Sequence, residues 1–183
     1  GLYRHSFYAN FFVYDFESDE DARSITNFSL GKQRLAQLSP AGDKVAFVRE
    51  NNIFISDLAT GAEIQVTTDG VTNAIINGAT DWVYEEEFGD DQGLFWNGDG
   101  SRLAYLKFDE SNVREFHMPV YGSLYPDPYT FKYPKAGKTT AKSACTSTPS
   151  PRTRAVQWPC PSRRTTFRAS SGRKIPRPFA FSP

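Results

Sequence analysis

Apolar and polar residues alternate in short runs through most of the chain, and clusters of Gly, Pro, Asn and Asp separate these runs. Alternation with a period of two turns one face of each run toward a core and therefore predicts β-strands. A turn at Leu38–Asp43 precedes one such run, and Asn51-Asn52 predicts a hairpin turn after it. The predicted strands are Phe7–Phe16 (one or two strands), Ser24–Thr26, Lys44–Arg49, Ile53–Leu58 and Glu63–Thr67.

Two pairs of segments repeat along the chain. Residues 12–26 resemble residues 54–67 at an offset of 42 that falls to 41, and residues 39–49 resemble residues 97–107 at an offset of 58. A four-stranded unit that recurs about every 40 residues, with longer insertions, is typical of β-propeller blades. We therefore predict an all-β fold, a partial β-propeller of two to three four-stranded blades. Two or three blades cannot close a ring, so we expect a piece of a larger sheet-built protein.

The composition changes abruptly near residue 138. Residues 1–137 contain 11 Lys and Arg and all 21 Asp and Glu, a net charge of 11 − 21 = −10, whereas residues 138–183 contain 10 basic residues and no acid. The second part also holds 7 of the 12 prolines and both cysteines. Tyr121–Tyr133 is rich in Tyr and Pro and is interpreted as an ordered loop or outer strand. We predict that the propeller covers residues 1–138 and that residues 139–183 form a disordered tail.

One acidic stretch, Asp81–Phe88, is the main candidate for chemistry. It places three consecutive glutamates directly behind an aromatic, strand-like tetrapeptide, Asp81-Trp82-Val83-Tyr84. A solvated charge run at a helix start or in a loop explains many such sequences. The alternative is an anionic pocket that holds a cation, since a carboxylate and an ammonium group about 4 Å apart attract by about 4 kcal/mol near the protein surface.

Other familiar motifs fail on inspection. Gly137-Lys138-Thr139 lacks the upstream glycine of a phosphate loop, and Asn97–Gly100 lacks the glutamate that closes a calcium loop. No Gly-x-Ser-x-Gly sequence occurs. His5 and His117 have no metal-ligand spacing, so no metal or cofactor is predicted. The Arg-rich tail could attract nucleic acid, but a slipped reading frame also produces basic, patternless sequence, and we predict no nucleic-acid partner.

The flanks of the acidic stretch favour the cation pocket. The chain resembles the dipeptidyl peptidase IV family, serine peptidases of the prolyl oligopeptidase superfamily, from about residue 2 to residue 138, and the Trp-x-Tyr-Glu-Glu-Glu core is highly specific to that family. The matching segments are Tyr3-Arg4-His5-Ser6, Asn77–Phe88, Trp96–Val113 and Tyr133-Pro134-Lys135-Ala136-Gly137.

The resemblance implies a role for each residue of the motif. Glu86 and Glu87 would bind the free N-terminal ammonium group of a peptide substrate, and Arg4 would contact a carbonyl of its backbone. Glu85, Trp82 and Tyr84 would give structural support, the two aromatic residues by core packing. The family releases N-terminal dipeptides with Pro or Ala at the second position, so the implied partners are peptides with a free N-terminus.

The resemblance also implies parts that this sequence does not contain. The catalytic triad of the family belongs to an α/β-hydrolase domain of the same polypeptide, so no catalytic residue is assigned here. Family members are often homodimers and are commonly periplasmic, secreted or membrane-anchored. The alternative function is a non-catalytic propeller that serves as an interaction scaffold. Because the family pattern stops near residue 138, we expect the tail to result from a frameshift or a mispredicted gene end.

Overall fold

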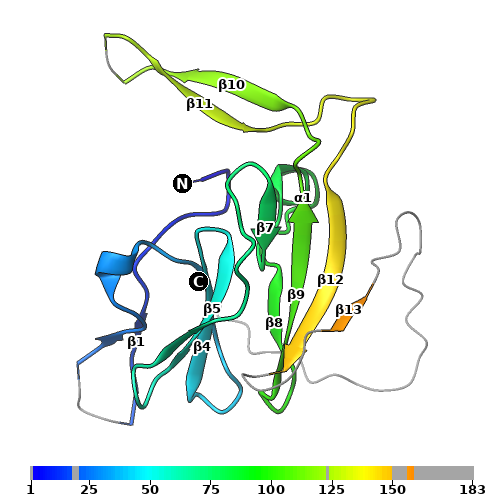
Figure 1. Ribbon diagram of the computed structural model, residues 1–183. Coiled ribbons are helices and arrows are strands. Elements are labelled where there is room, and N and C mark those ends of the chain that lie inside the picture. The colour runs from blue at the N-terminus through cyan, green and yellow to red at the C-terminus, as the bar shows by residue number, and fades with distance from the viewer. Residues whose placement is uncertain (1, 18–20, 123, 150–155, 159–183) are drawn as a thin grey trace.

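The computed structural model describes residues 2–17, 21–122, 124–149 and 156–158, and within them short strands predominate, with a single short α-helix beside the end of β9 (Arg102–Asp109) (Figure 1). The elements in chain order are β1 (Phe12–Val13), β2 (Arg23–Ser24), the 3-10 helix η1 (Phe28–Leu30), β3 (Arg34–Leu38), β4 (Lys44–Arg49), β5 (Asn52–Asp57), β6 (Glu63–Gln65), β7 (Ile75–Asn77), α1 (Trp82–Phe88), β8 (Leu94–Trp96), β9 (Arg102–Asp109), β10 (Glu115–Val120), β11 (Asp127–Lys132), β12 (Lys142–Pro149) and β13 (Val156–Trp158). No helix in these ranges is long and apolar enough to cross a membrane.

The first complete blade is the antiparallel sheet β3-β4-β5-β6, whose strands pair in chain order. The register of β4 and β5 runs from Lys44↔Asp57 to Arg49↔Asn52. Glu50 and Asn51 have φ angles of 50° and 59° and form the tight turn between them, which is the geometry of the commonest two-residue hairpin. The predicted hairpin is therefore present, with its turn one residue earlier than expected.

The second blade is built around β9. Its sheet has the order β13-β12-β9-β7, and β8 also pairs with β9. β7 and β8 pair with successive parts of the same edge of β9. The pairing with β7 begins at Ile75↔Asp109, and the pairing with β8 ends at Trp96↔Leu103. Together they make one inner strand that is interrupted between residues 78 and 93.

The interruption closes on a single residue of β9. Gly78 N–H donates to the Leu106 carbonyl, and Leu106 N–H donates to the Gly93 carbonyl, each at 2.8 Å. Gly78 has a φ of 77°, and a Cβ atom there would lie 2.8 Å from Cγ1 of Ile53. Glycine is therefore required where the chain leaves the strand. Residues 79–92 form a detour from the blade, and this detour carries α1.

Hydrophobic packing joins the blades. Ala46 and Val48 of β4 lie in one buried cluster with Leu103 and Tyr105 of β9, and Figure 1 shows the sheets of these two strands next to each other. The opposite face of β4, with Val45 and Phe47, packs on Ile25 beside β2. The alternation predicted for Lys44–Arg49 thus buries both faces of the strand.

The repeat also explains the N-terminal sheet. β1 and β2 pair with each other, and the offsets of 42 and 41 place them at the positions of β5 and β6. They correspond to the outer hairpin of a preceding blade. The fold is therefore a partial β-propeller, with two blades and the outer hairpin of another in the described residues. β10 and β11 form a separate hairpin that extends away from both sheets (Figure 1), so part of Tyr121–Tyr133 is indeed a strand.

The predicted boundary at residue 138 does not mark the end of ordered structure. Lys142–Pro149, which the prediction placed in a disordered tail, forms β12 and pairs along the whole of β9 from Asp109 to Arg102. Strand pairing uses backbone groups, so it requires neither acidic residues nor strong alternation. Residues 150–155 and 159–183 lie outside the described residues, and the disorder and frameshift expected there stay predictions.

Candidate cation-binding site

The acidic stretch is a helix and not the strand-like segment that its aromatic residues suggested. Asp81 has extended backbone angles and accepts a hydrogen bond from Tyr84 N–H at 3.1 Å, which is N-cap geometry. Gly89 adopts a left-handed conformation with a φ of 71° and ends α1 with hydrogen bonds to the Glu85 and Tyr84 carbonyls. These two caps outweigh the strand preference of Trp82-Val83-Tyr84.

Glu85 anchors the N-terminal segment to this helix. Its side chain is fully buried, and Oε1 accepts hydrogen bonds from the backbone N–H groups of His5 and Ser6, each at 2.7 Å. Hydrogen bonds from neutral donors to a carboxylate are short and comparatively strong. Residues separated by about 80 positions in the sequence are thereby fixed side by side. The structural role expected for Glu85 has a specific form: it holds the backbone of the two residues that follow Arg4.

Arg4 and Glu86 form a second contact between the N-terminal segment and α1. Arg4 N–H donates to Glu86 Oε1 at 3.1 Å, and its Nε lies 2.9 Å from Oε2. The Arg4 side chain remains 70% exposed, whereas the Glu86 side chain is only 12% exposed. Glu87, the next residue of the helix, is exposed. The structure therefore brings Arg4, Glu85 and Glu86 together and leaves Glu87 open to solvent beside them.

The aromatic residues of the motif hold the helix in place. The Trp82 ring contacts Tyr133 edge-on with centroids 4.4 Å apart. The Tyr84 ring contacts Phe108 of β9 at 4.9 Å, also edge-on. Edge-to-face aromatic pairs contribute about 0.5–1.5 kcal/mol beyond the area they bury. The detour is thus packed against the second blade and against the segment that follows β11.

The electrostatics of the site favour a positively charged ligand. Glu86 and Glu87 lie near the C-terminal end of α1, where the helix dipole is negative and disfavours additional negative charge. The helix has no basic residue in its last turn. Burial raises the pKa of Asp81, against the hydrogen bond from Tyr84 N–H. With Arg4 balancing one glutamate, the exposed group retains a net negative charge that a cation would neutralise.

The polar groups of this site suit a hydrogen-bonding cation. In the ranges that the structure describes, no three His, Cys, Asp or Glu side chains gather as metal ligands would. An ammonium group has three donors and can be shared by two carboxylates. The exposed guanidinium of Arg4 adds donors for an oxygen acceptor on the same ligand.

Sequence reasoning missed part of this arrangement. The backbone N–H groups of His5 and Ser6 have no sequence signature, since every residue except proline carries such a group. Asp81 and Gly89 did carry a signal, because an acidic N-cap followed by a glycine at the opposite end is typical of a short helix. The Arg4–Glu86 pair could not be read from spacing, because 82 positions separate its partners.

Comparison with known proteins places these features in a family. The sequence model that matches residues 1–164 describes the dipeptidyl peptidase IV (DPP IV) N-terminal region. Dipeptidyl aminopeptidase B of Saccharomyces cerevisiae is 39% identical over 140 residues, which cover 74% of this chain and 16% of that protein. A probable dipeptidyl peptidase 4 of Aspergillus fumigatus is 38% identical over 144 residues, which cover 75% of this chain and 18% of that protein.

A solved structure agrees with the sequence matches. The crystal structure of Porphyromonas gingivalis dipeptidyl peptidase 4 superposes on 89% of this chain and 23% of its own, with a TM-score of 0.81 and 41% sequence identity. The chain therefore spans less than a fifth of the two curated relatives and about a quarter of the solved structure.

Proposed function

Because the chain belongs to the dipeptidyl peptidase IV family, we propose that it recognises the N-terminal amine of peptide substrates for a serine exopeptidase. The complete enzyme would release N-terminal dipeptides with Pro or Ala at the second position. Glu86 and Glu87 would hold the substrate ammonium group, and Arg4 would donate to a carbonyl of its backbone. A clamp of this kind measures a fixed distance from the amine to the bond that is cleaved.

The observation that carries the proposal is the Arg4–Glu86 pair beside the exposed Glu87. Two carboxylates and one guanidinium leave a single negative charge, and one ammonium group makes the complete site neutral. The same Arg4 side chain is positioned by Glu86 and is still exposed enough to reach a ligand. The glutamates would thus accept from the N-terminal ammonium group of a peptide, and Arg4 would donate to a backbone carbonyl near it.

Catalysis would come from an α/β-hydrolase domain of the same polypeptide, since the 183 residues contain no Gly-x-Ser-x-Gly motif. The competing proposal is a propeller that serves as a non-catalytic interaction scaffold. The coding sequence that follows this region distinguishes the two. A Gly-x-Ser-x-Gly motif with Asp and His after it supports the peptidase, and its loss in an otherwise intact domain supports the scaffold.

The test of the clamp compares peptides with free and acetylated N-termini in a full-length polypeptide that carries this region. Glu86→Gln and Glu87→Gln should each lower kcat/KM for the free peptide by about 10- to 100-fold, since a charge-assisted hydrogen bond contributes about 1.5–3 kcal/mol. The acetylated peptide lacks the charge and should be a poor substrate for every variant. Glu50→Gln removes an exposed glutamate elsewhere and is the matched control.

Arg4→Ala should lower kcat/KM for the free and the acetylated peptide by similar factors, because a carbonyl acceptor is present in both. If the Glu86 and Glu87 variants keep the full preference for a free amine, the clamp is assigned to the wrong residues. The acidic stretch would then be a solvated charge run on a packed helix.

A further inference from the structure

A polar cavity adjoins the segments that carry the cation-binding site. It has a volume of about 290 Å³, and its walls come from the N-terminal segment, the start of β3, the chain between residues 72 and 80, Glu110 and strand β11. None of Arg4, Glu86 and Glu87 lines it. The volume is at the lower end of the range for small-molecule pockets, so the cavity suits a small ligand or a single side chain.

The unusual residue of this cavity is Arg34. Its side chain is only 2% exposed. Among the residues that the structure describes, neither Nε nor Nη2 of this guanidinium has a hydrogen-bond partner. The ring of Tyr8 faces it, with 5.8 Å from Cζ to the ring centroid. Leaving these two donors of a buried cation without hydrogen bonds is strongly unfavourable, so this edge of the guanidinium is available to bind a partner.

The positions of Nε and Nη2 of Arg34 indicate which chemical group would bind there. Nε–H and one Nη2–H form a single edge of the planar guanidinium and point in the same direction, which matches the two oxygens of a carboxylate. We propose that this cavity is a carboxylate-binding site in which Arg34 forms a bidentate pair with the ligand. This proposal does not rest on the amine clamp or on the assignment as a peptidase.

The surroundings favour a carboxylate over a phosphate. Among the described residues that line the cavity, Arg34 is the one basic residue, and it shares the cavity wall with Glu110, Tyr3 and Tyr129. A single cation balances a monoanion better than a phosphate that carries nearly two charges. Burial and the nearby Asp81 raise the pKa of Glu110 to about 7, with Lys132 opposing. Near neutral pH this carboxyl group can therefore donate a hydrogen bond.

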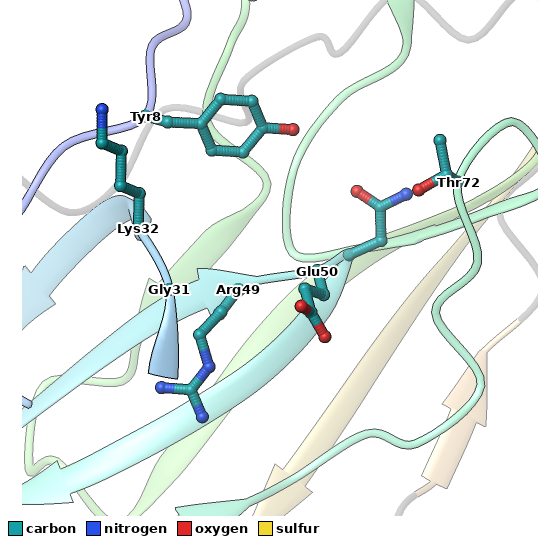
Figure 2. A pocket seen from close by; sticks show the side chains of 7 residues that line it. Tyr8, Gly31, Lys32, Arg49, Glu50 and Thr72 are labelled. Atoms are coloured by element: carbon teal, nitrogen blue, oxygen red, sulfur yellow. The ribbon is translucent and has the colours of Figure 1, made fainter. Parts of the chain in front are cut away.

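The neighbouring larger cavity lacks these properties. Its volume is about 480 Å³ and it shares Tyr8, Asn51 and Thr72 with the Arg34 cavity. Its lysine and glutamate, Lys32 and Glu50, are exposed. Figure 2 shows Arg49 extending away from Tyr8, and this arginine is already paired with Glu63. Among the described residues, the charged side chains of the larger cavity are therefore either exposed or already paired, although this cavity adjoins the carboxylate site.

The carboxylate can come from two sources, a free small molecule or an acidic side chain from another part of the same polypeptide. The experiment uses a full-length polypeptide that carries this chain, and measures its melting temperature near pH 6.5 at constant ionic strength. The probes are N-acetylglycine, its uncharged twin N-acetylglycinamide, and inorganic phosphate. The variants are Arg34→Met, Arg34→Lys and the exposed control Lys32→Met, and an unliganded crystal structure supplies the second measurement.

For a free carboxylate, N-acetylglycine should raise the melting temperature of the wild type and of Lys32→Met in a saturable manner. Arg34→Lys keeps the charge but lacks the paired donors, so its apparent Kd should be at least about tenfold weaker. Arg34→Met should not respond, and N-acetylglycinamide should have no effect on any variant. If Arg34→Met does not fold, the comparison of Arg34→Lys with the wild type still shows whether N-acetylglycine binds through Arg34.

For an internal carboxylate, none of the proteins should respond, and the crystal structure should place an Asp or Glu carboxylate within hydrogen-bond distance of both Arg34 atoms. The proposal is overturned if there is no response and no such carboxylate. It is also overturned if phosphate stabilises the protein through Arg34 and N-acetylglycine does not.

Discussion

Truncating Glu85 should release the N-terminal segment from α1 without unfolding the blades. Glu85→Ala removes the acceptor for the backbone N–H groups of His5 and Ser6, which both donate to its Oε1 at 2.7 Å. A hydrogen bond to a charged group contributes about 1.5–3 kcal/mol, and a buried donor left without a partner is penalised by a similar amount. Ser6 is buried and His5 is exposed, so we expect a local loss of about 3 kcal/mol.

Amide hydrogen exchange of a full-length polypeptide measures this loss directly. A local destabilisation of about 3 kcal/mol corresponds to exchange more than about 100-fold faster in a peptide that covers residues 2–9. Peptides from β4 and β5 should keep their protection, because their pairing does not involve Glu85. Glu85→Gln keeps an oxygen acceptor and should therefore lie between the wild type and Glu85→Ala.

Glu87→Ala is the matched control, since it removes an exposed glutamate from the same helix. Exchange in residues 2–9 should stay within about threefold of the wild type, as for an ordinary surface substitution. If Glu85→Ala accelerates exchange by less than about fivefold, the carboxylate does not hold the segment, and the positioning of Arg4 needs another explanation.

Three further substitutions test the fold, each in a full-length polypeptide. Burial raises the pKa of Glu110 to about 7, so its stabilising contribution is present below about pH 4.5 and is lost as the pH rises through 7, by about 2–3 kcal/mol in total. In melting curves against pH, Glu110→Gln should lack this decline, and parallel curves for the two proteins would contradict the burial argument. Gly78→Ala should destabilise the protein by about 1–3 kcal/mol in denaturant unfolding, because the position has a positive φ and no room for Cβ. Gly98→Ala, with open space around it, should be nearly neutral, and equal effects would refute the steric reason. Trp96→Phe should lose about 1–2 kcal/mol, because its Nε1–H donates to the Gln37 carbonyl between the blades at 3.0 Å; an unchanged midpoint would show that this bond contributes nothing.

The sequence predicted the blades well because their strands are short, apolar and repeated. Val45 and Phe47 alternate with Ala46 and Val48, and both sets are buried. The helix α1 was missed because Trp82, Val83 and Tyr84 all have high strand propensity, while the capping hydrogen bonds at Asp81 and Gly89 decide the structure.

The limit at residue 138 was wrong for a different reason. Composition averaged over a 46-residue tail concealed one eight-residue segment, Lys142–Pro149, that extends the second sheet through its backbone. The motif predicted a site at the glutamates and Arg4, and that prediction stands untested; the structure shows only that Arg4 and the backbone after it contact Glu85 and Glu86. The contacts between them depend on how two blades stack, and no local pattern encodes that distance.

Because α1 lies in the detour between β7 and β8, it can be replaced without a change to the strands on either side. Gly78 bonds to the carbonyl group and Gly93 to the N–H group of one residue, Leu106, so the two ends of the detour already meet at the edge of the blade. A short turn in place of residues 79–92 would leave the pairing of β7 and β8 with β9 unchanged. With this junction kept, the segment that carries α1 can be lengthened, shortened or exchanged without a change in the strand pairing of the propeller beneath it.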